Sequence, residues 1–105
     1  MLDYARRANG RVAGVSRERF DSDEDLQIII THLIQIIGEA ATHVSPATRE
    51  AHPEVPWIDI AGMRHRIVHD YVNIDLEIVW ETATRRLPEL ITQLQKFTPP
   101  EPPSA

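Results

Sequence analysis

The strongest constraint on the fold is a periodic apolar pattern that runs from residue 26 to residue 44. Its members recur at steps of three, four or one, the spacing of one face of an α-helix: Leu26, Ile29, Ile30, Leu33, Ile37, Ala40, Ala41 and Val44. We assign this row to the core. Ile28, Ile34 and Ile36 fall outside it, so the helix carries surplus apolar surface, which favours a second partner surface such as a subunit interface.

Shorter signals before this helix predict two small elements. Residues 1–14 begin as a helix but meet Gly10 and Gly14, which predicts a short first helix. Ser16 is typical of an N-cap ahead of a single turn, and the acidic residues of 21–25 suit the positive end of the long helix.

Prolines and caps divide the second half of the chain. Ser45 and Pro46 end the long helix, residues 47–56 are predicted to form a loop, and a third helix is expected to begin near Trp57. We therefore expect an all-α chain.

The last predicted helix follows a break in the apolar pattern. Asn73 or Asp75 is expected to cap it, and its core row lies between residues 76 and 94. Pro88 lies inside this row, and an interior proline removes a helical hydrogen bond, which predicts a kink near residues 85–87.

Length, charge and cysteine content limit the function. The 105 residues suffice for one domain with a modest core. The net charge of -5 argues against nonspecific polyanion binding, although residues 1–20 carry five arginines against Asp3 and Glu18, a net of +3. A nucleic-acid role must therefore rest on local patches. The absence of cysteine excludes disulfides and thiolate chemistry.

The start of the chain shows no apolar signal-peptide core, and no apolar run approaches the length of a membrane span. We therefore expect a soluble, cytoplasmic protein that has no contact with membranes.

Ionisable side chains are concentrated in residues 63–72, "MRHRIVHDYV". An imidazole titrates near neutrality and exchanges protons with hydroxyl groups, whereas a guanidinium grips phosphate in a forked geometry. Arg64 and His69 together form a minimal apparatus for phosphodiester chemistry without a metal ion. On one straight helix they lie about 140° apart, so either the helix ends between them or two copies cooperate.

Other readings of this cluster stay open. An arginine-rich helix face is commonly solvated, and a histidine at a helix end is commonly a cap. His65 and His69 have the i, i+4 spacing of a zinc pair, but no third ligand is evident nearby, so no metal site is predicted. Asp70 either orients a neighbouring base or bridges to Arg66, and Tyr71 is either a packing aromatic or an exposed hydroxyl beside the site.

The order of residues 64–71 resembles the motif Arg, four residues, His, any residue, Tyr of the HEPN ribonuclease superfamily, specifically its HepT-like toxins. Three other segments are similar to that family: "IIGEAA" (36–41), "PEVPW" (53–57) and "IDLEIVWE" (74–81). The resemblance covers roughly residues 16–97. It implies an antiparallel HEPN-like bundle in residues 1–97, from which the short first helix departs, because family members generally begin with a longer one. The proline-rich end of the chain, residues 98–105, is expected to be a disordered or polyproline tail.

For function, the resemblance implies a homodimer with two motifs facing each other across a two-fold cleft. It implies metal-independent RNA cleavage, in which the ribose 2′-hydroxyl attacks the adjacent phosphate and no cofactor takes part. Arg64 binds phosphate and His69 handles protons, while His65, Arg66, Asp70 and Tyr71 support them. A local basic cleft is expected from Arg64 and Arg66 with further arginines (Arg6, Arg7, Arg85, Arg86).

The resemblance also implies a partner, a minimal nucleotidyltransferase antitoxin that neutralises the toxin by AMPylation of Tyr71. The alternative is a noncatalytic helical module that binds such a nucleotidyltransferase.

Overall fold

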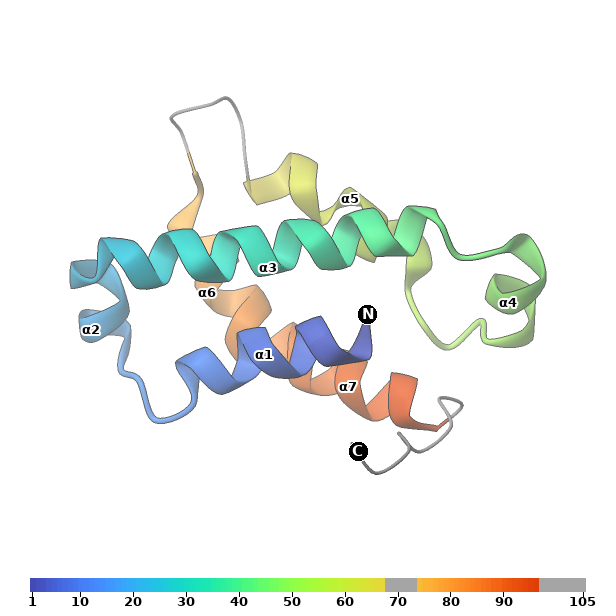
Figure 1. Ribbon diagram of the computed structural model, residues 1–105, viewed down its shortest axis with the longest axis horizontal. Helices are drawn as coiled ribbons and strands as arrows, with labels where there is room; N and C mark the ends of the chain where they lie inside the picture. The colour runs from blue at the N-terminus through green and yellow to red at the C-terminus, as the bar shows by residue number, and fades with distance from the viewer. Residues whose placement is uncertain (68–73, 97–105) are drawn as a thin grey trace, which may run out of the picture.

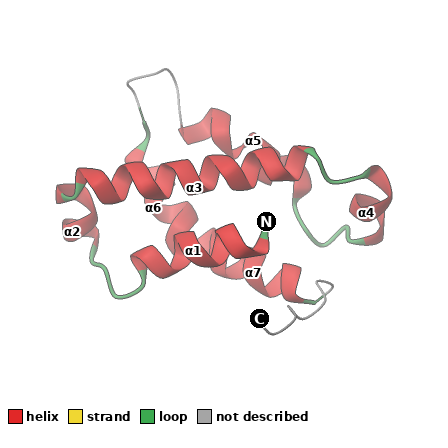
Figure 2. Ribbon diagram, in the orientation of Figure 1, coloured by secondary structure: helices red, strands yellow, loops and turns green. Residues whose placement is uncertain are grey.

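A computed structural model describes residues 1–67 and 74–96 of the chain, and every regular element within these ranges is helical (Figure 2). The all-α prediction is confirmed for this part. The elements are α1 (Leu2–Val12), α2 (Arg17–Ser22), α3 (Glu24–Thr42), α4 (Pro46–Ala51), α5 (Trp57–Ile67), α6 (Leu76–Glu81), the π-helical segment η1 (Thr82–Arg86) and α7 (Leu87–Gln95).

The longest helix, α3, crosses the molecule and organises the others around it (Figure 1). It packs most extensively against α5 and α1, and α1 in turn packs against α7. The short helices α2 and α6 meet at one end of the molecule, and α4 lies at the other (Figure 1). A hollow of about 400 Å³ lies between α5 on one side and η1 with α7 on the other.

The core is aliphatic and draws on every long helix. Its fully or nearly fully buried members are Ala5, Ala8 and Val12 of α1, Phe20 of α2, Ile30, Ile34, Ile37 and Ala41 of α3, Val55, Trp57, Ile60, Met63 and Ile67 in and just before α5, and Val79, Ala83, Leu87, Leu90 and Leu94 of the last three elements. The core row predicted for residues 76–94 is therefore confirmed in its buried members. No helix in the described ranges is long and apolar enough to cross a membrane.

The prediction for the core row of α3 is wrong at two positions. Ile34 is fully buried although it fell outside the predicted row, and Ile29, which was placed in the row, is 37% exposed. Because α3 contacts both α1 and α5, the buried arc is set by where these neighbours lie, and a wide apolar arc alone does not specify it. The predicted surplus apolar surface is present, since Ile28 is 54% exposed.

Local side-chain signals placed most helix starts correctly. Ser16 caps α2, with its Oγ accepting from the backbone N–H of Arg19, and Asp75 caps α6 by accepting from Ile78 N–H. Asn73, the other cap considered, lies outside the described residues. The third long helix, α5, begins at Trp57 as predicted.

Residues 47–56 contain a helix that the sequence analysis did not predict. This helix is α4. Ser45 is its N-cap, because the Ser45 Oγ accepts from Thr48 N–H, and Pro46 lies in its first turn. Proline is well suited to that position, where a helix needs no N–H donor. The pair Ser45-Pro46 is therefore a helix start as well as a boundary.

The first helix continues through Gly10 and ends before Gly14, whose φ of +74° is the left-handed conformation that glycine adopts without strain. The last helical path is irregular just before Pro88, where a kink was predicted, and the irregularity is a π-helical turn. This turn spans Thr82–Arg86, and α7 begins at Leu87. A π turn accommodates the proline within an otherwise continuous helical path.

Candidate active site

The motif begins at Arg64 in the last turn of α5, and the packing of this helix fixes where it begins. Trp57 anchors the start of α5, because its side chain is buried and Nε1 donates to the carbonyl of His52 at 3.0 Å. Ile60, Met63 and Ile67 follow at steps of three and four and are buried in the core. The motif is therefore built on a helix held tightly along one face.

The structure describes the predicted site only in part. The backbone of Arg64 lies in α5, but its side chain is outside the described part of the structure. His69, Asp70 and Tyr71 also lie outside the described residues. The described members, His65 and Arg66, are exposed on α5.

Arg66 has a partner that the sequence analysis did not predict. Its Nη2 lies 2.9 Å from Oδ1 of Asp59, two helical turns earlier on α5, and both side chains are about half exposed. Residues seven apart share a helix face, so the spacing of Asp59 and Arg66 in the sequence could have predicted this ion pair. An exposed pair of this kind contributes about 0–1 kcal/mol, so it orients the guanidinium more than it stabilises the fold.

The chain returns to the motif helix directly after the undescribed segment. The backbone N–H of Asp75 donates to the carbonyl of Ile67 at 2.8 Å, which joins the start of α6 to the end of α5. Ile67 and Asp75, which precede and follow His69, Asp70 and Tyr71 in the chain, are therefore held next to each other. Since the Asp75 side chain also caps α6, both helices are anchored at this junction.

An arginine of the π segment η1 lies close to the motif helix α5. Arg66 and Met63 of α5 line a small hollow of about 110 Å³ together with Glu81 and Arg86. Arg85 lines the larger neighbouring hollow between α5 and α7. Neither Arg85 nor Arg86 forms an ion pair within the described residues, so both guanidinium groups are available to a ligand.

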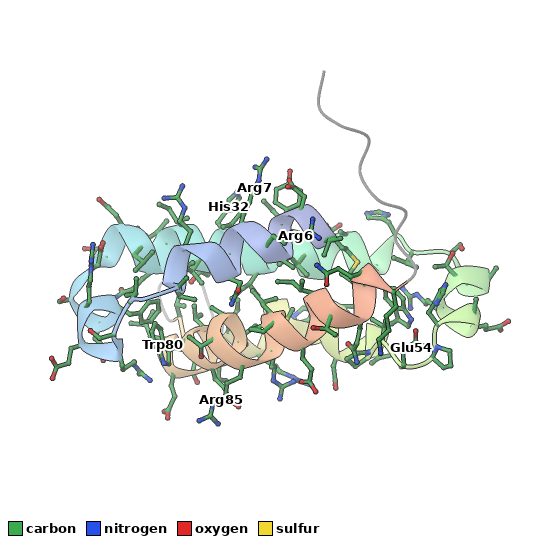
Figure 3. The ribbon with its side chains drawn as sticks, turned by 90° about the horizontal axis from the view of Figure 1, so that it is seen from below. Arg6, Arg7, His32, Glu54, Trp80 and Arg85 are labelled. Carbon is green, nitrogen blue, oxygen red and sulfur yellow. The ribbon has the colours of Figure 1, made fainter. Side chains whose placement is uncertain are left out.

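The other two arginines expected in a basic cleft are not part of this cluster. Arg6 and Arg7 project from α1 in the upper half of Figure 3, whereas Arg85 projects from the lower edge. Arg7 is also paired with Asp3 at 3.1 Å and lies over the ring of Tyr4. The expectation of a basic cleft that includes Arg6 and Arg7 is therefore wrong, because α1 and η1 present their exposed faces to different sides.

Carboxylates accompany these arginines. The larger hollow between α5 and α7 is lined by Glu54, Asp59, Glu81 and Glu89 as well as by Arg85 and Arg86. Within residues 1–67 and 74–96, no three His, Asp or Glu side chains are grouped closely enough to hold a metal ion.

Comparison with known proteins places this arrangement in a family. The protein family described as "Ribonuclease HepT-like" matches residues 1–97 of the 105-residue chain. The chain belongs to the HepT-like ribonuclease family. The predicted resemblance is therefore confirmed, and the motif on α5 belongs to a HepT-like chain.

Relatives of this HepT-like chain carry ribonuclease names. "Putative RNase TTE0752" of Caldanaerobacter subterraneus subsp. tengcongensis is 39% identical over 87 residues, which cover 83% of this chain and 78% of the relative. "Probable ribonuclease HepT" of Thermococcus cleftensis is 32% identical over 80 residues, which cover 76% and 73%. No solved structure gives a significant match. Family and relatives together support a ribonuclease.

Proposed function

We propose that this protein is a metal-independent endoribonuclease in which Arg64 and His69 are the catalytic residues. The observation that carries the proposal is the sequence order Arg64, four residues, His69 in a HepT-like chain, with Arg64 in the last turn of α5. Arg66, held by Asp59 on the same helix, and His65, exposed beside it, are the supporting groups.

The proposed reaction needs only proton transfer and charge stabilisation. The ribose 2′-hydroxyl attacks the adjacent phosphorus, the bond to the 5′-oxygen of the next nucleotide breaks, and a 2′,3′-cyclic phosphate and a 5′-hydroxyl result. His69 moves the proton that leaves the 2′-oxygen or the one that the departing oxygen takes up. Arg64 binds the phosphate oxygens, where negative charge grows in the transition state.

Two copies of the chain are proposed to form each active site. Arg64 and His69 lie about 140° apart if the helix runs straight, and exposed apolar side chains on α3 and α5 offer surface for a partner. Ile28 is 54% exposed and Ile58 is 84% exposed. A two-fold dimer through the face of α5 that carries Ile58 would let Arg64 of one chain and His69 of the other reach the same phosphate.

In the cell we propose a toxin role, with RNA as substrate and a minimal nucleotidyltransferase as antitoxin. Transfer of AMP to the Tyr71 hydroxyl, with pyrophosphate leaving from ATP, would place a phosphodiester anion next to the arginines of the motif. This anion would compete with RNA phosphate for the same donors. AMPylation would thereby inhibit RNA cleavage in the cytoplasm, and the chain would become toxic only when it is present without the AMP group.

The test is cleavage of RNA by the purified protein and by its Arg64→Ala and His69→Ala variants. Both variants should lose cleavage by about a hundredfold or more, because each removes a group that acts in the transition state. Circular dichroism and thermal unfolding should stay close to wild type. EDTA should leave the wild-type rate unchanged. Full loss of activity in EDTA, restored by a divalent ion, would contradict the metal-free mechanism.

A further inference from the structure

A third hollow, with polar groups that have no partner, lies at the end of the molecule where α2 meets α6. Its volume is about 300 Å³, and it is lined by Arg17, Glu77, Trp80, Glu81, Thr84 and Arg85. Figure 3 shows Trp80 and Arg85 projecting from the same side of the molecule, away from Arg6 and Arg7. None of its lining residues belongs to the motif of residues 64–71.

Three charged groups in this hollow have no partner within the described residues. Glu77, Glu81 and Arg85 form no ion pair or side-chain hydrogen bond there. The two remaining polar groups are engaged, because Arg17 is paired with Asp21 at 2.9 Å and the Thr84 hydroxyl donates to the carbonyl of Trp80. A ligand in the hollow therefore meets two free carboxylates and one free guanidinium.

The π segment helps to keep Glu81 and Arg85 apart. They are separated by four residues, a spacing that commonly forms an ion pair on an α-helix. Arg85 lies within η1, where the hydrogen bonds span five residues, as in the bond from Leu87 N–H to the carbonyl of Thr82. The changed register leaves both side chains exposed and unpaired.

Trp80 supplies a fixed aromatic surface. Its ring packs on the fully buried Phe20, with centroids 5.1 Å apart and planes tilted by 42°. The rest of the half-buried indole lines the hollow. A rigid aromatic ring at the edge of a groove is a stacking surface for an unpaired nucleobase, and such stacking contributes substantially to single-strand binding.

The charges select among the parts of an RNA chain. A carboxylate only accepts hydrogen bonds and repels phosphate, whereas a guanidinium only donates. The matching group must therefore offer several N–H donors, acceptors and a flat ring. Guanine does so, with N1–H and the N2 amino group facing a carboxylate and with O6 and N7 facing an arginine.

We propose that this hollow is a subsite for an unpaired guanine of the RNA substrate, with Trp80 stacking on the base, Glu77 and Glu81 accepting from its N1–H and N2 amino group, and Arg85 donating to O6 and N7. The inference rests on the proposed RNA cleavage. Glu81 also lines the small hollow that holds Arg66 and Arg86, so an RNA strand running from the motif to Trp80 passes Arg86.

The test compares short single-stranded RNAs that contain one guanine with RNAs in which inosine, which lacks the N2 amino group, replaces it. Binding is measured with the His69→Ala protein, which does not cut the probe. The guanine RNA should bind about tenfold more tightly, the size expected for one lost hydrogen bond to a charged group. In Glu77→Gln/Glu81→Gln this preference should fall below about twofold.

The matched control is Glu24→Gln/Glu50→Gln, which removes the same charge from exposed positions on α3 and α4 that line none of the hollows described above. Both double variants should bind the inosine RNA somewhat more tightly, because each removes two negative charges. Only the first should lose the preference for guanine. Arg85→Gln should weaken binding of the guanine RNA, and Arg6→Gln is its control, since both arginines are exposed and neither forms an ion pair or side-chain hydrogen bond within the described ranges.

Mapping of cleavage sites separates this inference from the proposed function. Wild-type protein should cut at a constant distance from a guanine, and Glu77→Gln/Glu81→Gln should cut with that dependence lost. RNA cleavage without any guanine dependence would overturn the subsite and leave the ribonuclease proposal intact. Equal loss of preference in both double variants would also overturn it. Competition by free GMP as effective as by the guanine RNA would show that the hollow takes a mononucleotide, against the proposal.

Discussion

At the scale of single residues, the site combines groups that the sequence displays with groups that only the fold brings near. Arg64, His69 and Tyr71 are recognisable from their spacing, because a motif is local information. The pairing of Arg66 with Asp59 is also local, because the two residues lie two turns apart on α5. Each residue of a helix has several neighbours on its face, however, so the spacing alone does not identify the partner. Arg86 reaches the hollow that Arg66 lines from a segment twenty residues later, and no local pattern predicts this.

Tyr71 is the residue at which we expect control of the activity. The chain contains two tyrosines, Tyr4 and Tyr71, so modification of each is easily separated. Co-expression with an active nucleotidyltransferase should add the mass of AMP to wild type and to Tyr4→Phe, but not to Tyr71→Phe. RNA cleavage by Tyr71→Phe should stay within about tenfold of wild type, because the hydroxyl is not required for proton transfer.

The outcome is read by intact-mass spectrometry and by RNA integrity in the same cultures. Tyr71→Phe should remain toxic in the presence of the nucleotidyltransferase. If wild type gains no AMP, or Tyr71→Phe gains as much, inhibition by AMPylation at this residue is refuted and the antitoxin must act by binding.

At the scale of helical elements, the sequence predicts where a helix begins better than it predicts where the helical geometry is irregular. Ser16 and Asp75 cap α2 and α6 as expected because the interaction lies within three residues. The π form of η1 was not predictable from Pro88 alone. In this turn the N–H of Leu87 donates to the carbonyl of Thr82, five residues earlier. The same spacing would pair the carbonyl of Ala83 with residue 88, which is proline and has no N–H. The carbonyl of Ala83 is satisfied instead from α1.

Asn9 of α1 supplies the missing donor. Its Nδ2 lies 3.1 Å from the carbonyl of Ala83, in a partly buried contact between segments 74 residues apart. Asn9→Ala should lower the free energy of unfolding by about 1–2 kcal/mol, because a partly buried carbonyl loses its donor. The midpoint of thermal unfolding should fall by about 5 °C at fixed protein concentration. Gln95→Ala, at an exposed site, should change it by less than about 0.5 kcal/mol.

A double-mutant cycle with Pro88→Ala isolates this contact. Alanine at position 88 restores an N–H near the carbonyl of Ala83, so Asn9→Ala should cost less in that background, with a coupling of about 0.5–1 kcal/mol. Equal costs in the two backgrounds would mean that Asn9 stabilises α1 in another way.

At the scale of the whole molecule, the described surface is not that of a well-covered monomer. Ile58, Gly62 and His65 follow one another at steps of four and three on the outer face of α5. Among the described residues, a methyl group at position 62 would meet no atom within 4 Å apart from its chain neighbours and its own helix backbone. Ile58 is 84% exposed. A large apolar side chain and open space on the helix that carries the motif favour close approach of a second helix there.

This surface makes the proposed composite site testable by mixing inactive proteins. If Arg64 and His69 act on one phosphate from different chains, a dimer of one Arg64→Ala chain and one His69→Ala chain contains one intact site. Random exchange between equal amounts should therefore restore about a quarter of wild-type RNA cleavage. Ile58→Glu, introduced into both chains, should yield monomers by sedimentation and abolish this recovery, because a buried unpaired charge disfavours the interface.

Ala13→Glu is the matched control for that charge, since it adds a carboxylate at an exposed position between α1 and α2, away from α5 (Figure 1). It should leave both the dimer and the recovery unchanged. Mixed inactive proteins that exchange chains, as shown by mass-tagged subunits, yet recover no activity would place Arg64 and His69 of one chain in the same site. In that case the helix must turn after Ile67 far enough to overcome the angle of about 140° between the two residues, and the dimer would serve stability and not chemistry.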